Sequence, residues 1–228
     1  PFLLLLPGLL LARQSGLAIL GGLNALDPGA ITSAELWAPA PGQMNCSLPA
    51  PREMYHHTLD TWQVTLIACY GYSCDQLTPS GWQHWRTTLY SRKYHTSAVT
   101  SQGLLLVGGS ESPTTTELLP WDGGESREGF TLQSTRFQHC SVQPNLDTII
   151  LMGGEFNTES LVTVYSGLGA GEEVTTRKLA PLLHPRSGHA CGFYSVGDSR
   201  VRLLLPNSRF AKFPSPAIDW KIWKALYL

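Results

Sequence analysis

The sequence predicts an all-β fold made of repeated modules, each with four short strands. A His precedes a short β-like run and a small-residue turn three times, with separations of 13, 13 and 14 residues. The spacing from one such His to the next, and from the last of them to His189, is looser, at 38, 44 and 50 residues. A constant short spacing inside a variable long one indicates a repeated structural unit whose loops differ in length. The 22 Gly and 16 Pro residues are scattered along the chain, as many tight turns require.

Each module begins with an Arg-x-x-His segment or a close variant of it, and a short first strand follows. The second strand is a continuous apolar run, and continuous rather than alternating apolar character predicts burial on both faces. The copies of this second strand are LAIL (17–20), VTLIAC (64–69), LLLV (104–107) and IILM (149–152).

A pair of small residues ends the second strand, where it permits positive φ and the close approach of a neighbour. The third strand alternates polar and large apolar residues, as a half-exposed strand does. Pro residues in the fourth strand favour an outer edge, where no backbone donor is needed. We expect third strands at 32–39, 114–121 and 158–167, and fourth strands at 45–51, 84–88, 130–135 and 175–181.

This pattern over residues 17–205 resembles the kelch repeat, which implies a β-propeller of radially packed blades. About four to five four-stranded blades are expected. An incomplete ring is the favoured arrangement and a closed four-bladed ring the alternative. Two departures are Tyr70 in place of a Gly and Leu204-Leu205 in place of a Gly pair. The residues that carry the resemblance are Gly21, Gly22, Gly108, Gly109, Gly153 and Gly154, with Gly71 in the departing second copy, the openings at Arg52, Arg92, Arg136 and Arg186, the residues His57, His95, His139 and His189, and the aromatic positions Trp37, Trp82, Trp85, Trp121 and Tyr165.

The two ends of the chain do not follow the repeat. Residues 1–16 contain an apolar run typical of a secretory signal, although an inner strand of the first module is the alternative. Residues 206–228 form a tail in which Ser215-Pro216 is a plausible helix start, with an unstructured segment as the alternative. These features favour a secreted protein over a cytoplasmic one, with no stable membrane span.

The five Cys residues also bear on whether the protein is secreted, because disulfides form in oxidising compartments. Cys69 and Cys74 flank a Tyr-Gly-Tyr-Ser turn and are expected to close a small hairpin loop. Cys140 and Cys191 lie in matching strands of consecutive modules, but buried free thiols are the preferred interpretation for them. Asn45 begins an N-glycosylation sequon, which would be modified only in a secreted chain.

No catalytic set emerges from the sequence. The recurring His and Arg residues are expected to serve the modules as fixed hydrogen-bonding groups, so neither a metal site nor a cofactor is predicted. The resemblance raises a galactose-oxidase-like or other glycan-acting enzyme as the alternative, yet its Tyr, His and Cys set cannot be placed here. The net charge of −1 gives no basic stripe for nucleic acid.

We therefore expect a non-catalytic, secreted, glycosylated and disulfide-bonded repeat protein that binds an unknown protein or glycan. An intracellular kelch adaptor is a further alternative. Binding residues in such folds lie on loops held by a rigid scaffold. The loops of most variable length are expected at 23–34, 72–81, 110–116, 122–129 and 155–160.

Overall fold

The computed structural model describes residues 56–63, 65–155, 160–169 and 173–192 with their side chains. It also describes the backbone of the remaining strand residues. All regular elements of this described part are β-strands, which confirms the all-β prediction. Several expectations lie outside it: the 1–16 segment, Gly21, Gly22, Asn45, Arg52 and the 206–228 tail.

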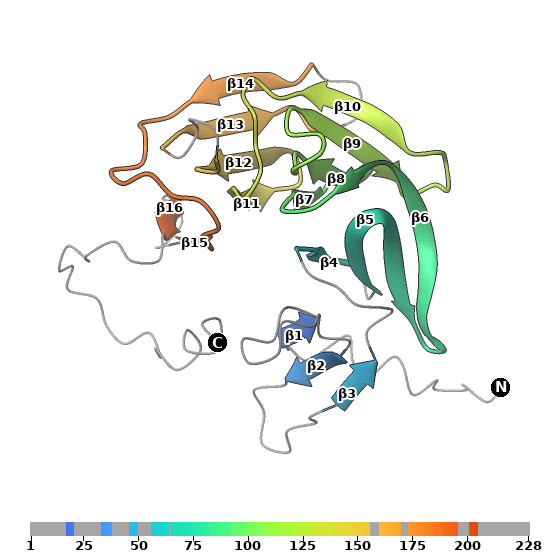
Figure 1. Ribbon diagram of the computed structural model, residues 1–228. Helices are drawn as coiled ribbons and strands as arrows, with labels where there is room; N and C mark the ends of the chain where they lie inside the picture. Colours follow the sequence, from blue (N-terminus) through green and yellow to red (C-terminus); the bar gives the residue numbers. More distant parts are fainter. Residues whose placement is uncertain are drawn as a thin grey trace.

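Two sheets have the expected four antiparallel strands in sequence order (Figure 1). The first contains β7 (Thr96–Val99), β8 (Gly103–Val107), β9 (Thr115–Pro120) and β10 (Arg127–Thr131). The second contains β11 (Cys140–Asn145), β12 (Thr148–Met152), β13 (Val162–Ser166) and β14 (Thr175–Lys178). Every residue of β8 is buried, so its uninterrupted apolar run covers both faces of the sheet, as the sequence predicted.

The preceding sheet has three elements, β4 (Thr58–Trp62), β5 (Thr65–Thr78) and β6 (Gly81–Arg92), in that order. Within β5 the Cα atoms of Cys69 and Cys74 are only 4.0 Å apart. Five residues of extended strand would span roughly 16 Å, so β5 must reverse direction between these cysteines. Figure 1 draws it as a bent arch. The predicted loop 72–81 is therefore largely strand, because residues 73–78 form the second arm of β5 and pair with β6.

The outer sheets are smaller. The first consists of β1 (Leu17–Leu20), β2 (Ser33–Trp37) and β3 (Cys46–Pro49), paired antiparallel in that order. The last consists of β15 (Gly192–Ser195) and β16 (Val201–Leu204). In this last sheet β15 and β16 pair antiparallel, with Gly192 opposite Leu204 and Ser195 opposite Val201.

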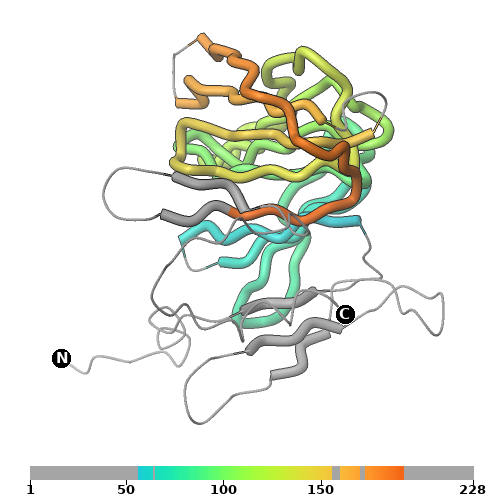
Figure 2. Tube along the Cα trace, turned by 90° about the vertical axis from the view of Figure 1, so that its left-hand side faces the viewer, coloured from blue at the N-terminus to red at the C-terminus, as the bar shows by residue number. Residues whose placement is uncertain are grey.

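The β4–β6, β7–β10 and β11–β14 sheets lie side by side in chain order, and the first strand of each lies on the inner side (Figures 1 and 2). There β4 contacts β7, β7 contacts β11, and β11 contacts β15. Apolar clusters fill the spaces between neighbouring sheets. One, containing Leu105, Ile149 and Tyr165, joins the β7–β10 and β11–β14 sheets, and another, containing Ile67 and Leu104, joins the β4–β6 and β7–β10 sheets. Each of these three sheets therefore packs its apolar side chains against a neighbour and depends on that neighbour for burial.

Candidate functional site

Two of the Arg residues that open the modules, Arg92 and Arg136, are buried and bind backbone at the end of the sheet they precede. Arg92 Nη1 donates to the Gly108 carbonyl at 2.6 Å, and its Nη2 donates to Thr115 Oγ1 at 2.9 Å. Arg136 Nη1 donates in the same way to the Gly153 carbonyl at 2.6 Å. Burial lowers the pKa of both guanidinium groups, which nevertheless remain charged. These side chains hold the glycine turns in place.

The two guanidinium sites differ in one acceptor. Arg92 Nε lies 3.4 Å from Glu117 Oε2, and this carboxylate also accepts from the Leu89 amide at 2.6 Å. In the next module Thr163 Oγ1 accepts from Arg136 Nη2 at 2.8 Å, and Arg136 Nε has no acceptor. One module therefore pairs its buried cation with a buried carboxylate, and the next relies on neutral oxygens.

Two of the recurring His residues, His95 and His139, lie at the contacts between successive sheets. His139 Nε2 lies 2.8 Å from Thr96 Oγ1, and His95 Nε2 lies 3.4 Å from Thr58 Oγ1, so each ring contacts the first strand of the preceding sheet. Burial, aided by the charge of the nearby Arg, lowers the pKa of His95 and of His139 to about 3. Both rings are thus neutral at physiological pH. The two rings are thus hydrogen-bonding groups at the contacts between modules, and the bonded atom is a Thr hydroxyl in each case.

The residue before each of the four recurring His residues has a left-handed backbone, with φ between +52° and +59°. These residues are His56, Tyr94, Gln138 and Gly188. The amides of these residues form a chain from one module to the next. Tyr94 N donates to His56 O, Gln138 N to Tyr94 O, and Gly188 N to Gln138 O, at 3.3, 3.0 and 2.7 Å. This chain of amides is not evident from the sequence, because Gly188 is the one glycine among the four residues.

The glycine turns fit closely against the next module. Gly109 N donates to Arg136 O at 2.8 Å, and Gly154 N donates to Arg186 O at 2.9 Å. A Cβ on Gly108 would lie 2.1 Å from the Arg136 carbonyl oxygen, and Gly108 has φ +64°. Close approach and positive φ both require glycine here, which is the physical role that the sequence pattern predicted.

Two disulfides are present in the described residues. Cys69–Cys74 closes the reversal in β5, in agreement with the predicted hairpin pair. Cys140–Cys191 ties β11 to the residue before β15, so the expectation of two buried free thiols was wrong. The register that brings these cysteines together is set by the contact between the two first strands, which spacing alone does not reveal. The disulfides fit an oxidising compartment.

Three tryptophans stack at one end of the sheets, and we call Trp62, Trp85 and Trp121 the tryptophan stack. The Trp62 and Trp121 ring centroids are 4.3 Å apart and nearly parallel, and Trp85 lies 5.5 Å from Trp121. The Trp121 Nε1 donates to the Thr100 carbonyl at 2.9 Å. The exposed residues 122–125 follow directly, within the predicted loop 122–129, and Arg127 already belongs to β10.

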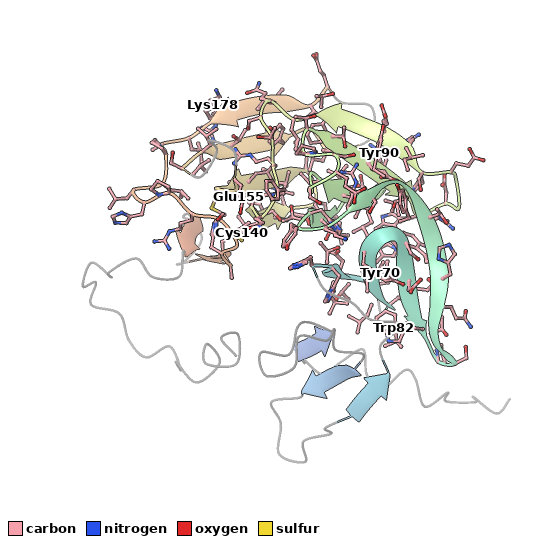
Figure 3. The ribbon with its side chains drawn as sticks, viewed as in Figure 1. Tyr70, Trp82, Tyr90, Cys140, Glu155 and Lys178 are labelled. Carbon is pink, nitrogen blue, oxygen red and sulfur yellow. A yellow bond between two sulfur atoms is a disulfide. The ribbon has the colours of Figure 1, made fainter. Side chains whose placement is uncertain are left out.

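A hydrogen-bonded polar group lies on the β5–β6 arm. The Tyr70 hydroxyl donates to the buried Asp75 carboxylate, and Tyr70 is labelled in Figure 3. Ser73 Oγ lies 3.2 Å from Asp75 Oδ1 and 3.1 Å from His84 Nδ1. His84 Nε2 in turn lies 3.2 Å from Thr87 Oγ1. These contacts brace the two arms of β5 against β6.

The other predicted loops are partly strand or only partly described. The 110–116 segment includes buried Ser112, and β9 begins inside it at Thr115. Only residue 155 and residue 160 of the 155–160 loop are described, and the 23–34 loop is outside the described part apart from the start of β2. Among the described residues, no group of three or more His, Cys, Asp or Glu side chains is arranged to hold a metal ion. The described part of the chain also contains no helix with the length and apolar character needed to cross a bilayer.

Comparison with known proteins identifies a fold but no family. No family model matches the chain, and no curated protein matches it in sequence. Among solved structures, the chain resembles that of YjhT, a protein of β-propeller-type fold, with a TM-score of 0.65 and 13% sequence identity. The likeness covers 79% of this chain and 66% of that one, so the chain spans about two thirds of YjhT. The chain thus has a β-propeller-like fold.

Proposed function

We propose that this chain is a secreted, kelch-type propeller module that binds a protein or a glycan without catalysis. The proposal is supported by the distribution of roles within the modules. The recurring Arg92, Arg136, His95 and His139 are buried at 5% exposure or less and bond to the scaffold. Groups committed in this way are poorly placed to bind a ligand or to transfer protons.

The observation that carries the proposal is the tryptophan stack beside an exposed loop. Large aromatic rings held rigidly next to polar loop residues are typical of recognition surfaces for proteins and sugars. The rings are half-buried, and Arg86 lies over Trp85 at 5.1 Å from the ring centroid, which adds a cation at the same place. The loop also contacts β6, because Ser126 Oγ donates to the Thr87 carbonyl at 2.9 Å.

A glycan array and a panel of purified extracellular proteins, probed with the secreted chain, would test this function. We expect selective binding that Arg86→Ala and Asp122→Ala weaken, since both side chains border the tryptophan stack or its loop. Lys178→Ala is the matched control, because Lys178 is exposed on β14 of another sheet (Figure 3). Binding that is equally strong in all variants would reject this surface.

Secretion and catalysis need separate tests. Expression with the native N-terminal segment should place the chain in the medium, with an endoglycosidase-sensitive mass at Asn45; retention in the cytoplasm would favour the intracellular adaptor. Stoichiometric copper together with aldehyde and peroxide production from sugars would instead support the oxidase-like alternative.

A further inference from the structure

A hollow of about 210 Å³ lies between the β7–β10 sheet and the connection from β13 to β14. Its inner wall is apolar, with Leu105, Leu118, Phe130 and Leu168. These residues belong to or pack against the apolar cluster that joins the two sheets. Arg127 and Gln102 line the hollow as well and give it one polar side.

The hollow is preformed, because Asp147 fixes the segment that closes one side of it. The Asp147 carboxylate accepts from Gly167 N at 3.2 Å and from Gly169 N at 2.9 Å, and its carbonyl accepts from Leu168 N at 3.1 Å. Gly167 has φ +87°, and a Cβ there would meet the Glu173 carbonyl at 2.7 Å. This segment is therefore fixed by three hydrogen bonds and by a backbone conformation at position 167 that requires glycine.

One cation faces the hollow. Arg127 is directly opposite Leu118 in the β9–β10 ladder, so both side chains lie on the same face of the sheet. Its one described hydrogen bond runs from Nη2 to Gln102 Oε1 at 3.1 Å, and a guanidinium carries five N–H donors.

The carboxylates near this cation are engaged in other contacts. Glu128 also lines the hollow, but it is opposite Glu117 in the β9–β10 ladder, and its carboxylate accepts from the Tyr90 hydroxyl of β6. Both Asp147 carboxylate oxygens are used by the glycine amides. The hollow thus combines apolar side chains on its inner wall with a polar side on which Arg127 supplies N–H donors.

We propose that this hollow binds a compact apolar carboxylate, with its hydrocarbon part against Leu118 and Phe130 and its carboxylate on Arg127. The volume sets the size of the ligand. An apolar cavity of roughly 150 Å³ holds benzene, whereas sites for drug-sized molecules are roughly 300 Å³ or larger. A phenyl ring with a short acid chain lies between these limits. This site is distinct from the loop surface of the proposed function and does not depend on it.

The test uses 3-phenylpropanoate as the probe and its neutral analogue 3-phenylpropanamide as the control ligand. Titration of the ¹⁵N-labelled chain should shift the amide signals of Gly167 and Gly169, with the acid binding better than the amide. A charge-assisted hydrogen bond contributes enough to predict roughly a tenfold loss of acid affinity in Arg127→Gln. Amide affinity should stay the same in this variant.

Arg177→Gln is the matched control variant, because Arg177 is an exposed arginine of β14 that does not line the hollow. It should bind the acid as the wild type does. Arg127 is itself exposed, so its replacement leaves the fold intact, and a thermal melt verifies this. The proposal is overturned if the acid does not bind, if acid and amide bind equally, or if Arg127→Gln and Arg177→Gln behave alike.

Discussion

Acid should lower the free energy of unfolding, because His95 and His139 gain protons in the unfolded chain at a higher pH than in the native one. His95 and His139 are each 5% exposed. Their burial, and to a smaller extent the charge of the neighbouring Arg, lowers the pKa of each to about 3. In the unfolded chain a His titrates near pH 6.5. Between these two pKa values the unfolded state binds more protons than the native state, so the free energy of unfolding falls as pH falls.

The size of the effect follows from the two pKa values. At pH 5 each His is about 1.5 pH units below its unfolded pKa, which costs about 2 kcal/mol per residue relative to pH 7. Asp60 opposes this, because burial raises its pKa to about 6 despite the hydrogen bond from Ser97. Protonation of Asp60 in the native state recovers about 1 kcal/mol over the same range. The net loss from these three groups is about 3 kcal/mol.

Urea unfolding at pH 7 and pH 5 measures this loss, and His139→Gln isolates one contribution. A Gln amide can still bond to Thr96 but does not titrate, so the variant should lose about 2 kcal/mol less than the wild type between the two pH values. Thr96→Val is the control: it removes the hydroxyl partner of His139, lowers stability at both pH values, and leaves the burial-driven pH dependence in place. A wild type equally stable at both pH values, or a His139→Gln variant with the wild-type loss, would refute the reasoning.

Three further predictions concern the scaffold, each measured as the change in unfolding free energy or melting temperature. Gly108→Ala should cost about 2 kcal/mol or more because its Cβ would lie 2.1 Å from a carbonyl oxygen, whereas Gly81→Ala, at φ +107° with nothing within 4 Å, should cost only about 1 kcal/mol of backbone strain. Thr163→Val should cost about 2 kcal/mol by leaving a donor of buried Arg136 without its acceptor, and an unchanged stability would contradict that role. Replacing both cysteines of the Cys140–Cys191 disulfide, which are 51 residues apart, should cost about 4 kcal/mol; a loss below 1 kcal/mol would show that the unfolded chain is not constrained by it.

The repeated framework was accessible from the sequence because its signals are local. The uninterrupted apolar run of β8 and the glycine pair after it report burial and close approach at those residues themselves. The Cys69–Cys74 disulfide was accessible for the same reason, since a turn of four residues separates the two cysteines.

Features that depend on contacts between modules were not accessible. The Cys140–Cys191 disulfide requires knowing which strands of neighbouring sheets face each other. Tyr94 and Gln138 have left-handed backbones because the amide chain between modules imposes them, against the preference of their residue types. The hollow results from the packing of a glycine segment against another sheet, which no periodicity reports.

The tryptophan stack and the hollow are connected by one short turn between β7 and β8. The Thr100 carbonyl accepts a hydrogen bond from the Trp121 indole N–H, and the Thr100 hydroxyl donates to the Gly103 carbonyl at 2.8 Å. Gln102 accepts the Trp121 amide on its backbone and Arg127 on its side chain, at 3.1 Å in both cases. Because the same turn positions an aromatic ring on one side and the cation on the other, the two surfaces keep a fixed relative geometry. A ligand that contacts both would therefore meet a preorganised template and would lose little free energy in ordering it.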